Sequence, residues 1–243
     1  MILFQVQINY IRCVLFKKIK VTMDKELVEK ILPSAIEPMM YSAREKTWEA
    51  LHKIAELIKP GITEKEAIKL ANQYLAGQGV KKFWHQTHVR FGHNTIYSFS
   101  DPYSENSKLN ENDIFFIDIG PIWDNIEGDC GKTFTVGHSH AKHQAIVSDV
   151  EKIFSEIKAF WRVSKVTGIE LCQYAEKVVT DAGYNLTPAY VKGHRLSEFS
   201  HKLYTNAKLF ELDFIPAAER WVLELHICDK SMEFGAFYED ILY

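Results

Sequence analysis

The pattern of apolar and polar positions predicts two helix pairs, one in each half of the chain. Residues 42–59 carry apolar side chains at spacings of three and four, as an amphipathic helix does. These positions are Trp48, Leu51, Ile54, Ala55 and Ile58. Pro60 and Gly61 end this helix, and a capping box formed by Thr63 and Glu66 begins another, which ends at Gly77.

A similar unit recurs about 107 residues later, counted from Gly61 to Gly168. Residues 148–164 have the pattern of a helix, and the sequence from Thr167 begins a second helix that ends near Gly183. This repetition predicts a two-fold internal duplication, in which each helix pair covers strands of its own half. The alternative is that two amphipathic hairpins resemble each other by chance.

Four apolar, β-rich segments predict the strands of a sheet. Residues 113–122 form the first predicted strand, and residues 126–136 form the second. An Asp-Asn pair between them suits a tight turn. Residues 220–228 and 235–243 form the last two. Because strands and helices occur in blocks, the predicted fold class is α+β with a mostly antiparallel sheet.

Composition excludes several classes of protein. The 243 residues include 32 acidic and 29 basic side chains, a net charge of −3, so the chain lacks the basic excess of a nucleic-acid-binding protein. No apolar run of about 18 residues occurs, so we expect no membrane segment. The four cysteines, at positions 13, 130, 172 and 228, form no C-x-x-C pair, which favours reduced thiols in a cytoplasmic protein.

Residues 1–22 differ from the rest of the chain. Their apolar-leaning start is followed by the cluster Lys17, Lys18 and Lys20, which is the reverse of the order in a signal peptide. Met23 then opens a helical sequence. We predict that residues 1–22 are an atypical extension or a mis-assigned start, with an added edge strand or interaction arm as the alternative. Residues 23–243 are predicted to form one domain.

Four carboxylates stand where the pattern predicts buried strands. Asp118 interrupts F-F-I-D-I-G, Glu224 interrupts W-V-L-E-L-H-I, and Glu239 interrupts A-F-Y-E-D-I-L. Asp129 lies on the strand predicted to pair with that of Asp118. Because a buried carboxylate without a partner costs several kcal/mol, such side chains are retained when they pair with cations, are protonated or bind metal.

The spacing of these acids favours a metal site. Asp118 and Asp129 are eleven residues apart across a short hairpin, which can place both side chains on one face of the sheet. Two neighbouring carboxylates repel each other, and a divalent cation removes the repulsion. His194 and His201 add nitrogen donors before the last two strands. Such a set suits two divalent ions about 3.5–4 Å apart.

In their order along the chain, five short segments resemble the pita-bread metallopeptidases, a family that includes methionine aminopeptidase, aminopeptidase P and prolidase. The segments read F-I-D-I-G-P-I-W-D, E-G-D-C-G-K-T-F, G-H-R-L-S-E-F-S-H, L-E-L-H and F-Y-E-D. The resemblance covers roughly residues 40–243. It implies the pita-bread fold, an α+β fold with a pseudo-two-fold duplication, which agrees with the repeated helix pairs.

The resemblance also implies roles for the matching residues. The implied ligands of two divalent ions are Asp118, Asp129, His194, Glu224 and Glu239. Asp118 would bind one ion, Asp129 and Glu239 would bridge both, and Glu224 would also shuttle protons. His201 would touch the substrate near the scissile bond. The ions, which the sequence leaves open among manganese, cobalt, iron and zinc, would activate a water molecule for attack on the peptide carbonyl.

One departure from the family concerns a histidine that usually precedes the first aspartate. Aligning R-F-G-H-N-T-I-Y-S-F-S with that segment places Phe99 at the position of the histidine. His85, His88 and His93 lie near enough in sequence to take over its role. His93 is the candidate for substrate binding, and surface or loop histidines are the alternative.

Two further residues are candidates for substrate binding. Arg195 follows His194 where methionine aminopeptidase has a glycine, and its guanidinium can hold a substrate carboxylate or pair with an acid such as Glu198. His226 lies two residues after Glu224, on the same predicted strand face, and either supports the site or is simply packed.

The predicted function is a dinuclear metal-dependent exopeptidase that removes the N-terminal residue of peptides, with proline second (Xaa-Pro). Its E-G-D-x-x-K-T-F and F-Y-E-D segments resemble the Xaa-Pro branch, although the 117 residues before Asp118 are too few for the extra domain of those enzymes. Methionine aminopeptidase and a non-catalytic binding module are the alternatives. The expected partner is a peptide substrate, without nucleic acid or membrane, and a homodimer is left open.

Overall fold

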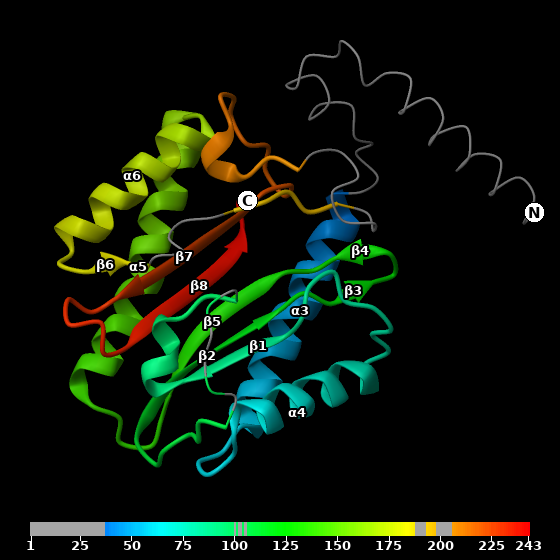
Figure 1. Cartoon of the computed structure of the whole chain (residues 1–243). Helices are drawn as coiled ribbons and strands as arrows, with labels where there is room; N and C mark the ends of the chain where they lie inside the picture. The colour runs from blue at the N-terminus through cyan, green and yellow to red at the C-terminus, as the bar shows by residue number, and fades with distance from the viewer. Residues whose placement is uncertain (1–36, 100, 102–103, 105, 188–192, 198–205) are drawn as a thin grey trace, which may run out of the picture. The chain divides into compact units, whose positions relative to one another are not determined.

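An antiparallel sheet of six strands, in the order β1-β2-β5-β8-β7-β6, carries the fold of this computed structural model (Figure 1). The structure describes residues 37–99, 101, 104, 106–187, 193–197 and 206–243. The strands of the sheet are β1 (His88–Phe91), β2 (Asp113–Ile119), β5 (Cys130–Val136), β6 (Asn185–Leu186), β7 (Val222–Cys228) and β8 (Gly235–Ile241). A separate small hairpin pairs β3 (Ile122–Trp123) with β4 (Ile126–Glu127). The predicted α+β class with an antiparallel sheet is confirmed.

The predicted helix pairs are also present. They are α3 (Glu37–Leu57) with α4 (Glu64–Gly77), and α5 (Ala141–Ser164) with α6 (Gly168–Asp181). Both second helices begin with a complete capping box, formed by Thr63 with Glu66 and by Thr167 with Glu170. Two short 3-10 helices, η1 (Gly92–Ile96) and η2 (Leu209–Glu211), complete the described elements.

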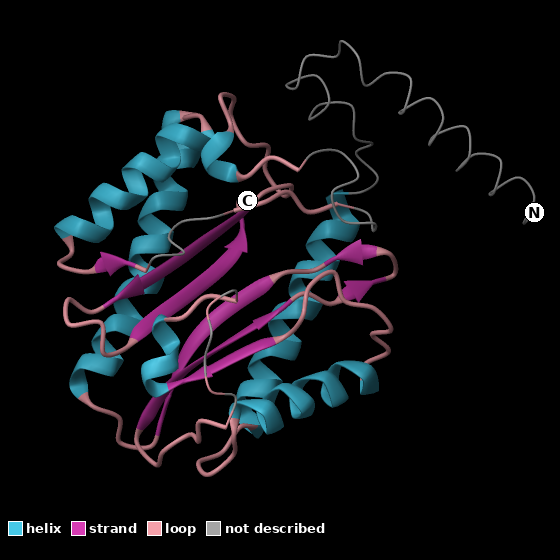
Figure 2. Ribbon diagram, in the orientation of Figure 1, coloured by secondary structure: helices cyan, strands magenta, loops and turns pink. Residues whose placement is uncertain are grey.

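Each helix pair packs on strands of its own half, as the duplication predicts. One hydrophobic core joins α3 and α4 to β1 and β2, and a second joins α5 and α6 to β7 and β8. Figure 2 shows α5 and α6 on the left of the sheet and α3 and α4 on its right. The two central strands, β5 and β8, pair with each other and join the halves into one sheet.

The alternation of side chains along the strands separates these cores from a polar row. Leu223 and Leu225 belong to the core under α5 and α6, so Glu224 between them faces the other side of the sheet. Ile117 and Ile119 likewise belong to the core under α3 and α4, and Asp118 lies between them. The helices therefore cover one face, and the acids gather on the opposite face.

Several predicted boundaries were wrong. Helix α5 begins at Ala141 and not at residue 148, because its first turn carries the polar residues Lys142, His143 and Gln144 and gives no apolar periodicity. The predicted strand 126–136 is interrupted after β4, and β1 and β6 were not predicted. The predicted domain boundary at residue 23 and the whole of residues 1–22 lie outside the described residues.

A buried ion pair attaches α3 to the last strand of the sheet. Arg44 donates from Nε and Nη2 to the two carboxylate oxygens of Asp240, at 2.7 and 2.6 Å, and Trp48 Nε1 donates to the same carboxylate at 3.1 Å. The Asp240 side chain is 2% exposed. Since Asp240 follows Glu239 directly, this contact also fixes the strand that carries a candidate ligand.

Replacing Arg44 by alanine is expected to lower the free energy of unfolding by about 3 kcal/mol, because it leaves a buried carboxylate without its cation. Urea unfolding of purified protein measures this change. The matched control is Lys53→Ala, which removes an exposed ion pair with Glu56 and should cost less than about 1 kcal/mol. Equal costs for the two variants would contradict the assignment of Arg44–Asp240 as a structural contact.

Two predictions from composition also have outcomes in the structure. Cys130, Cys172 and Cys228 are free thiols in buried positions. Among the described residues, no helix combines the length and the apolar character that crossing a membrane requires.

Candidate metal centre

The sheet register places three of the predicted ligands in one row. Asp118 on β2 lies opposite Gly131 on β5, Gly131 lies opposite Glu239 on β8, and Glu239 lies opposite Glu224 on β7. His88 on β1 extends the row on the other side of Asp118. Because directly opposed residues share one face, the pairing brings carboxylates from three strands together on the face that the helices leave open.

Asp129 and His194 complete the cluster from outside the regular strands. Asp129 precedes β5 and has a fully buried side chain. His194 Nε2 lies 3.0 Å from Asp129 Oδ2, 3.7 Å from Glu224 Oε1 and 3.8 Å from Glu239 Oε1. Ligand atoms of Asp129, His194 and Glu239 all lie within 4.8 Å of one another. The structure thus brings together all five residues predicted as ligands.

Backbone contacts hold the segment that carries His194 against β7. Val222 N–H donates to the His194 carbonyl at 2.9 Å, and Leu196 N–H donates to the Arg220 carbonyl at 2.8 Å. Gly193 permits this approach, because a Cβ there would lie 2.1 Å from the Val222 carbonyl oxygen. The position of the imidazole is therefore set by the sheet edge.

Burial and crowding change the pKa values of these acids. Burial, reinforced by Asp129 and Glu224, raises the pKa of Asp118 to about 7 against the opposing charge of His85. Burial and the neighbouring carboxylates raise the pKa of Glu239 well above its usual value. Burial also disfavours the charged form of Asp129, but hydrogen bonds from His194 and His85 outweigh it and lower its pKa. Although burial opposes their protonation, the same carboxylates raise the pKa of His194 and raise that of His85 to about 9, so protons on both imidazoles balance part of the negative charge of the cluster.

These residues fit divalent ions. Four carboxylates and an imidazole are donors that borderline divalent metals accept. Asp118 Oδ1 is buried and has no hydrogen-bond partner among the described residues, as expected for an oxygen arranged to bind a cation. A divalent charge would favour the ionised form of Asp118 and Glu239, which burial and mutual repulsion disfavour.

The candidate substrate-binding residues are placed differently from the metal ligands. His93 is exposed on η1, where its Nδ1 lies 3.0 Å from the Glu233 carbonyl, and no described contact joins it to the carboxylates. The chain leaves β1 just before His93, and on η1 the His93 Nε2 lies 3.4 Å from Tyr97 Oη. The role of His93 in substrate binding stays a prediction.

His226 and Arg195 are both buried, with 4% of each residue exposed. His226 lies on β7 two residues from Glu224, as predicted, but its Nε2 donates to the Thr95 carbonyl at 2.6 Å and its ring packs against Phe116 and Phe237. Burial lowers its pKa to about 4, so the ring is neutral. This arrangement favours packing and not contact with a substrate.

Arg195 forms an isolated β-bridge with Trp221, and its Nη1 donates to the Leu196 carbonyl at 3.4 Å. Its predicted alternative partner Glu198 lies outside the described residues, as does His201. Phe99, at the position of the family histidine, is 64% exposed, and its ring centroid lies 6.2 Å from that of His88.

His85 contributes more to the cluster than the sequence indicated. Its Nε2 lies 3.3 Å from Asp129 Oδ1 and 3.5 Å from Asp118 Oδ1. From the sequence, His85 was named only as one of three nearby histidines, because it precedes β1 and belongs to no periodic pattern. The sole signal was its F-W-H context, which places a histidine beside large aromatic residues.

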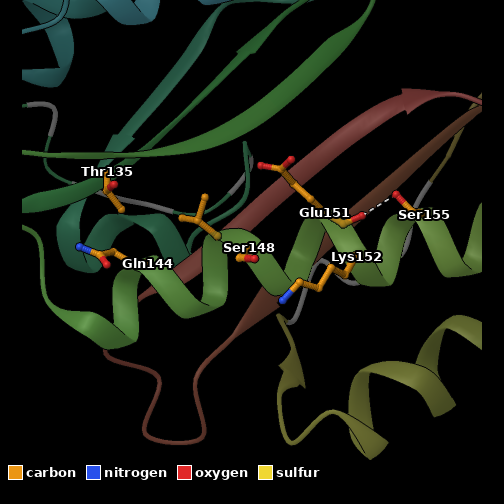
Figure 3. A pocket seen from close by; sticks show the side chains of 7 residues that line it. Thr135, Gln144, Ser148, Glu151, Lys152 and Ser155 are labelled. Atoms are coloured by element: carbon orange, nitrogen blue, oxygen red, sulfur yellow. Dashed lines mark hydrogen bonds between the residues drawn. The ribbon is translucent and has the colours of Figure 1, made fainter.

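A surface pocket on α5 is separate from this centre (Figure 3). Its lining consists of Thr135, Gln144, Val147, Ser148, Glu151, Lys152 and Ser155. None of the candidate metal ligands lines it, and Glu151 already pairs with Lys132 Nζ at 2.8 Å. The pocket offers no convergent set of donors comparable to the cluster on the sheet.

Comparison of the sequence with known proteins gives two findings. A model of metallopeptidase family M24 matches residues 38–211. An uncharacterized peptidase of Staphylococcus saprophyticus is 26% identical over 166 residues, which are 67% of this chain and 47% of that protein. This chain therefore spans about half the length of that curated relative.

Solved structures share the fold. The X-Pro aminopeptidase of Thermotoga maritima superposes with a TM-score of 0.69 at 19% identity, over 90% of this chain and 61% of that one. The methionine aminopeptidase of the same organism gives a TM-score of 0.67 at 15% identity, over 87% of this chain and 93% of that one. At these identities the likeness extends to the fold alone.

Proposed function

This chain belongs to metallopeptidase family M24, and from that premise we propose that it is a dinuclear metal-dependent exopeptidase that removes the N-terminal residue of Xaa-Pro peptides. The observation that carries the proposal is the meeting of five predicted ligands from separate strands and loops at one place on the sheet. Within it, ligand atoms of Asp129, His194 and Glu239 lie within 4.8 Å of one another.

The proposed ligands divide between two ions. Asp118 would hold one ion, His194 and Glu224 the other, and Asp129 and Glu239 would contact both. Divalent ions in such a site supply Lewis acidity and lower the pKa of bound water, which makes peptide hydrolysis feasible at neutral pH. Manganese, cobalt, iron and zinc all accept this donor set.

Glu224 is the residue proposed to move a proton. Its side chain is 20% exposed, more than those of Asp118, Asp129, His194 and Glu239, so it can reach a substrate while staying beside the ligands. A carboxylate placed there can accept a proton from the attacking water and deliver it to the leaving amine. His201 is proposed to contact the substrate carbonyl, on the sequence resemblance alone.

A peptide-cleavage assay with added metals tests the proposed specificity. We expect release of the first residue from an Ala-Pro peptide to exceed release from a Met-Ala peptide at least tenfold in kcat/KM. The support is the resemblance of E-G-D-x-x-K-T-F and F-Y-E-D to the Xaa-Pro branch. Protein with Asp129 replaced by alanine controls for contaminating peptidases.

Methionine aminopeptidase is the second candidate, because the methionine aminopeptidase of Thermotoga maritima shares the fold with a TM-score of 0.67. Faster release of methionine in the same assay would select it. Cleavage of neither peptide by protein loaded with metal would instead favour a non-catalytic binding module.

A further inference from the structure

The proposed ligand set leaves two nearby histidines unused, His85 and His88. His85 lies between α4 and β1, and its side chain is 18% exposed. Its Nε2 lies 3.3 Å from Asp129 Oδ1 and 3.5 Å from Asp118 Oδ1, whereas His194 contacts the other oxygen of Asp129. Two atoms that each lie about 2.0–2.2 Å from one metal ion are separated by distances of this size.

The other ring nitrogen of His85 fixes which atom can bind a metal. Nδ1 lies 2.7 Å from the Gln86 carbonyl oxygen. A carbonyl oxygen can only accept a hydrogen bond, so Nδ1 carries a proton. Nε2, which hydrogen-bonds Asp129 Oδ1, is therefore the nitrogen that would exchange its proton for a metal ion. Histidines that bind metals usually donate their second N–H to a carbonyl or carboxylate in this way.

The surrounding backbone holds the His85 ring in place. Trp84 N–H donates to the Gly120 carbonyl, and Ile122 N–H donates to the Lys82 carbonyl, both at 3.0 Å. The Trp84 ring centroid lies 4.3 Å from that of His85 and 4.6 Å from that of His194, so it packs against both imidazoles. This segment is thereby attached to the turn that follows Asp118.

Gly120 provides the space for the imidazole. A Cβ at this position would lie 2.1 Å from His85 Cδ2 and 2.3 Å from Nε2. The ring therefore packs directly on the backbone two residues after Asp118, where a larger residue would displace it. His88, by comparison, stacks on His85 at 5.9 Å, and its ligand atom lies within 4.8 Å of those of His85 and Asp118. No ion pair joins His88 to a carboxylate among the described residues.

We propose that His85 Nε2 is a ligand of the ion held by Asp118 and Asp129. This inference rests on the proposed two-ion site. It adds an imidazole to the ion for which the sequence predicted carboxylate ligands alone. Imidazole favours iron, cobalt and zinc over manganese relative to an oxygen-only site. His85 would therefore influence which metal the enzyme uses.

Titration of metal-free protein with Co²⁺ tests the proposal, with calorimetry and visible absorption as readouts. We expect the wild type to bind two ions and His85→Ala to bind one of them at least tenfold more weakly, with a changed visible spectrum. Added imidazole should restore the affinity by entering the space beside Gly120. The exposed His138→Ala is the matched control and should bind both ions as the wild type does.

A second test uses only the wild type, so its result does not depend on whether the His85→Ala variant folds. In the proton NMR spectrum of the Co²⁺-loaded protein, each coordinated imidazole should give one strongly shifted, exchangeable N–H signal. We expect two such signals, from His85 and His194.

Two outcomes would overturn the proposal, and they differ in what they leave standing. If the wild type binds two ions and His85→Ala binds them with unchanged affinity and spectrum, His85 is not a ligand and the proposed function remains. A single shifted N–H signal leads to the same conclusion. If the wild type binds less than one ion, the metal site fails, and with it both the inference and the proposed function.

Discussion

Replacing Asp129 by alanine is expected to abolish peptidase activity and to leave at most one bound ion. Its fully buried carboxylate contacts His194 at 3.0 Å through one oxygen and His85 at 3.3 Å through the other. A loss of at least 1000-fold in kcat/KM, about 4 kcal/mol in the activation barrier, is expected.

Metal analysis by mass spectrometry and peptide-cleavage kinetics measure the two effects together. Asp129→Asn keeps the shape of the side chain and removes its charge, so it separates loss of the ligand from loss of packing and should be nearly as inactive. Asp181→Ala removes an exposed carboxylate paired with Lys177 and is the control expected to be fully active. Wild-type activity of Asp129→Ala would refute the assigned centre.

Local signals account for the part of the fold that could be predicted from the sequence. The capping boxes at Thr63 and Thr167 are complete within four residues, so the starts of α4 and α6 follow from the sequence alone. Strand β1 has four residues and β6 has two, which is too short for alternation to distinguish them from loops. Their pairing depends on neighbours far away in the chain.

The carboxylates were predictable because each interrupts an apolar strand, where an unpaired charge is costly. The exact pairing register of the strands that carry them was not predictable. Asp118 pairs with Gly131, two residues beyond Asp129, since the β3–β4 hairpin intervenes between them. Both acids still reach one place, because a displacement of two residues keeps a side chain on the same face.

How deeply a side chain is buried was less predictable from the sequence than the face of the sheet to which it points. His226 faces the same side as Glu224, as the two-residue spacing requires, yet Phe116 and Phe237 cover it. Sequence periodicity states which face a side chain takes and not what packs over that face. His85 shows the converse, since its approach to Asp118 depends on the space at Gly120.

Without metal, the carboxylate cluster is expected to contribute less stability as the pH rises from about 4 to about 9. His88 and His226 act in the opposite direction up to pH 6.5, because burial lowers their pKa values to about 3 and about 4. Asp118 has an ordinary pKa of 3.8 and a pKa of about 7 in the folded chain, so between these values the folded state holds a proton that the unfolded state releases. Stability falls with pH wherever the folded state binds more protons. For Asp118 alone the change is on the order of 4 kcal/mol.

His85 extends the same trend to higher pH. Burial lowers its pKa, but Asp118 and Asp129 outweigh burial and raise it from 6.5 to about 9, so the stability from its charged form is lost as the pH rises through 9. The raised pKa of Glu239 acts in the same direction as that of Asp118. The lowered pKa of Asp129 matters only below its ordinary value of 3.8, outside this window.

Bound ions should remove this dependence, because they replace the protons that the folded site otherwise retains and bind more tightly as the ligands deprotonate. Urea unfolding at about pH 5, 7 and 9, with chelator and with Mn²⁺, measures the difference. In the metal-free profile, Asp118→Asn should remove the fall in stability that Asp118 contributes between about pH 4 and 7, relative to the wild type. If the stability profiles with and without Mn²⁺ are parallel, these carboxylates titrate independently of metal. That result would contradict the proposed metal centre without any measurement of activity.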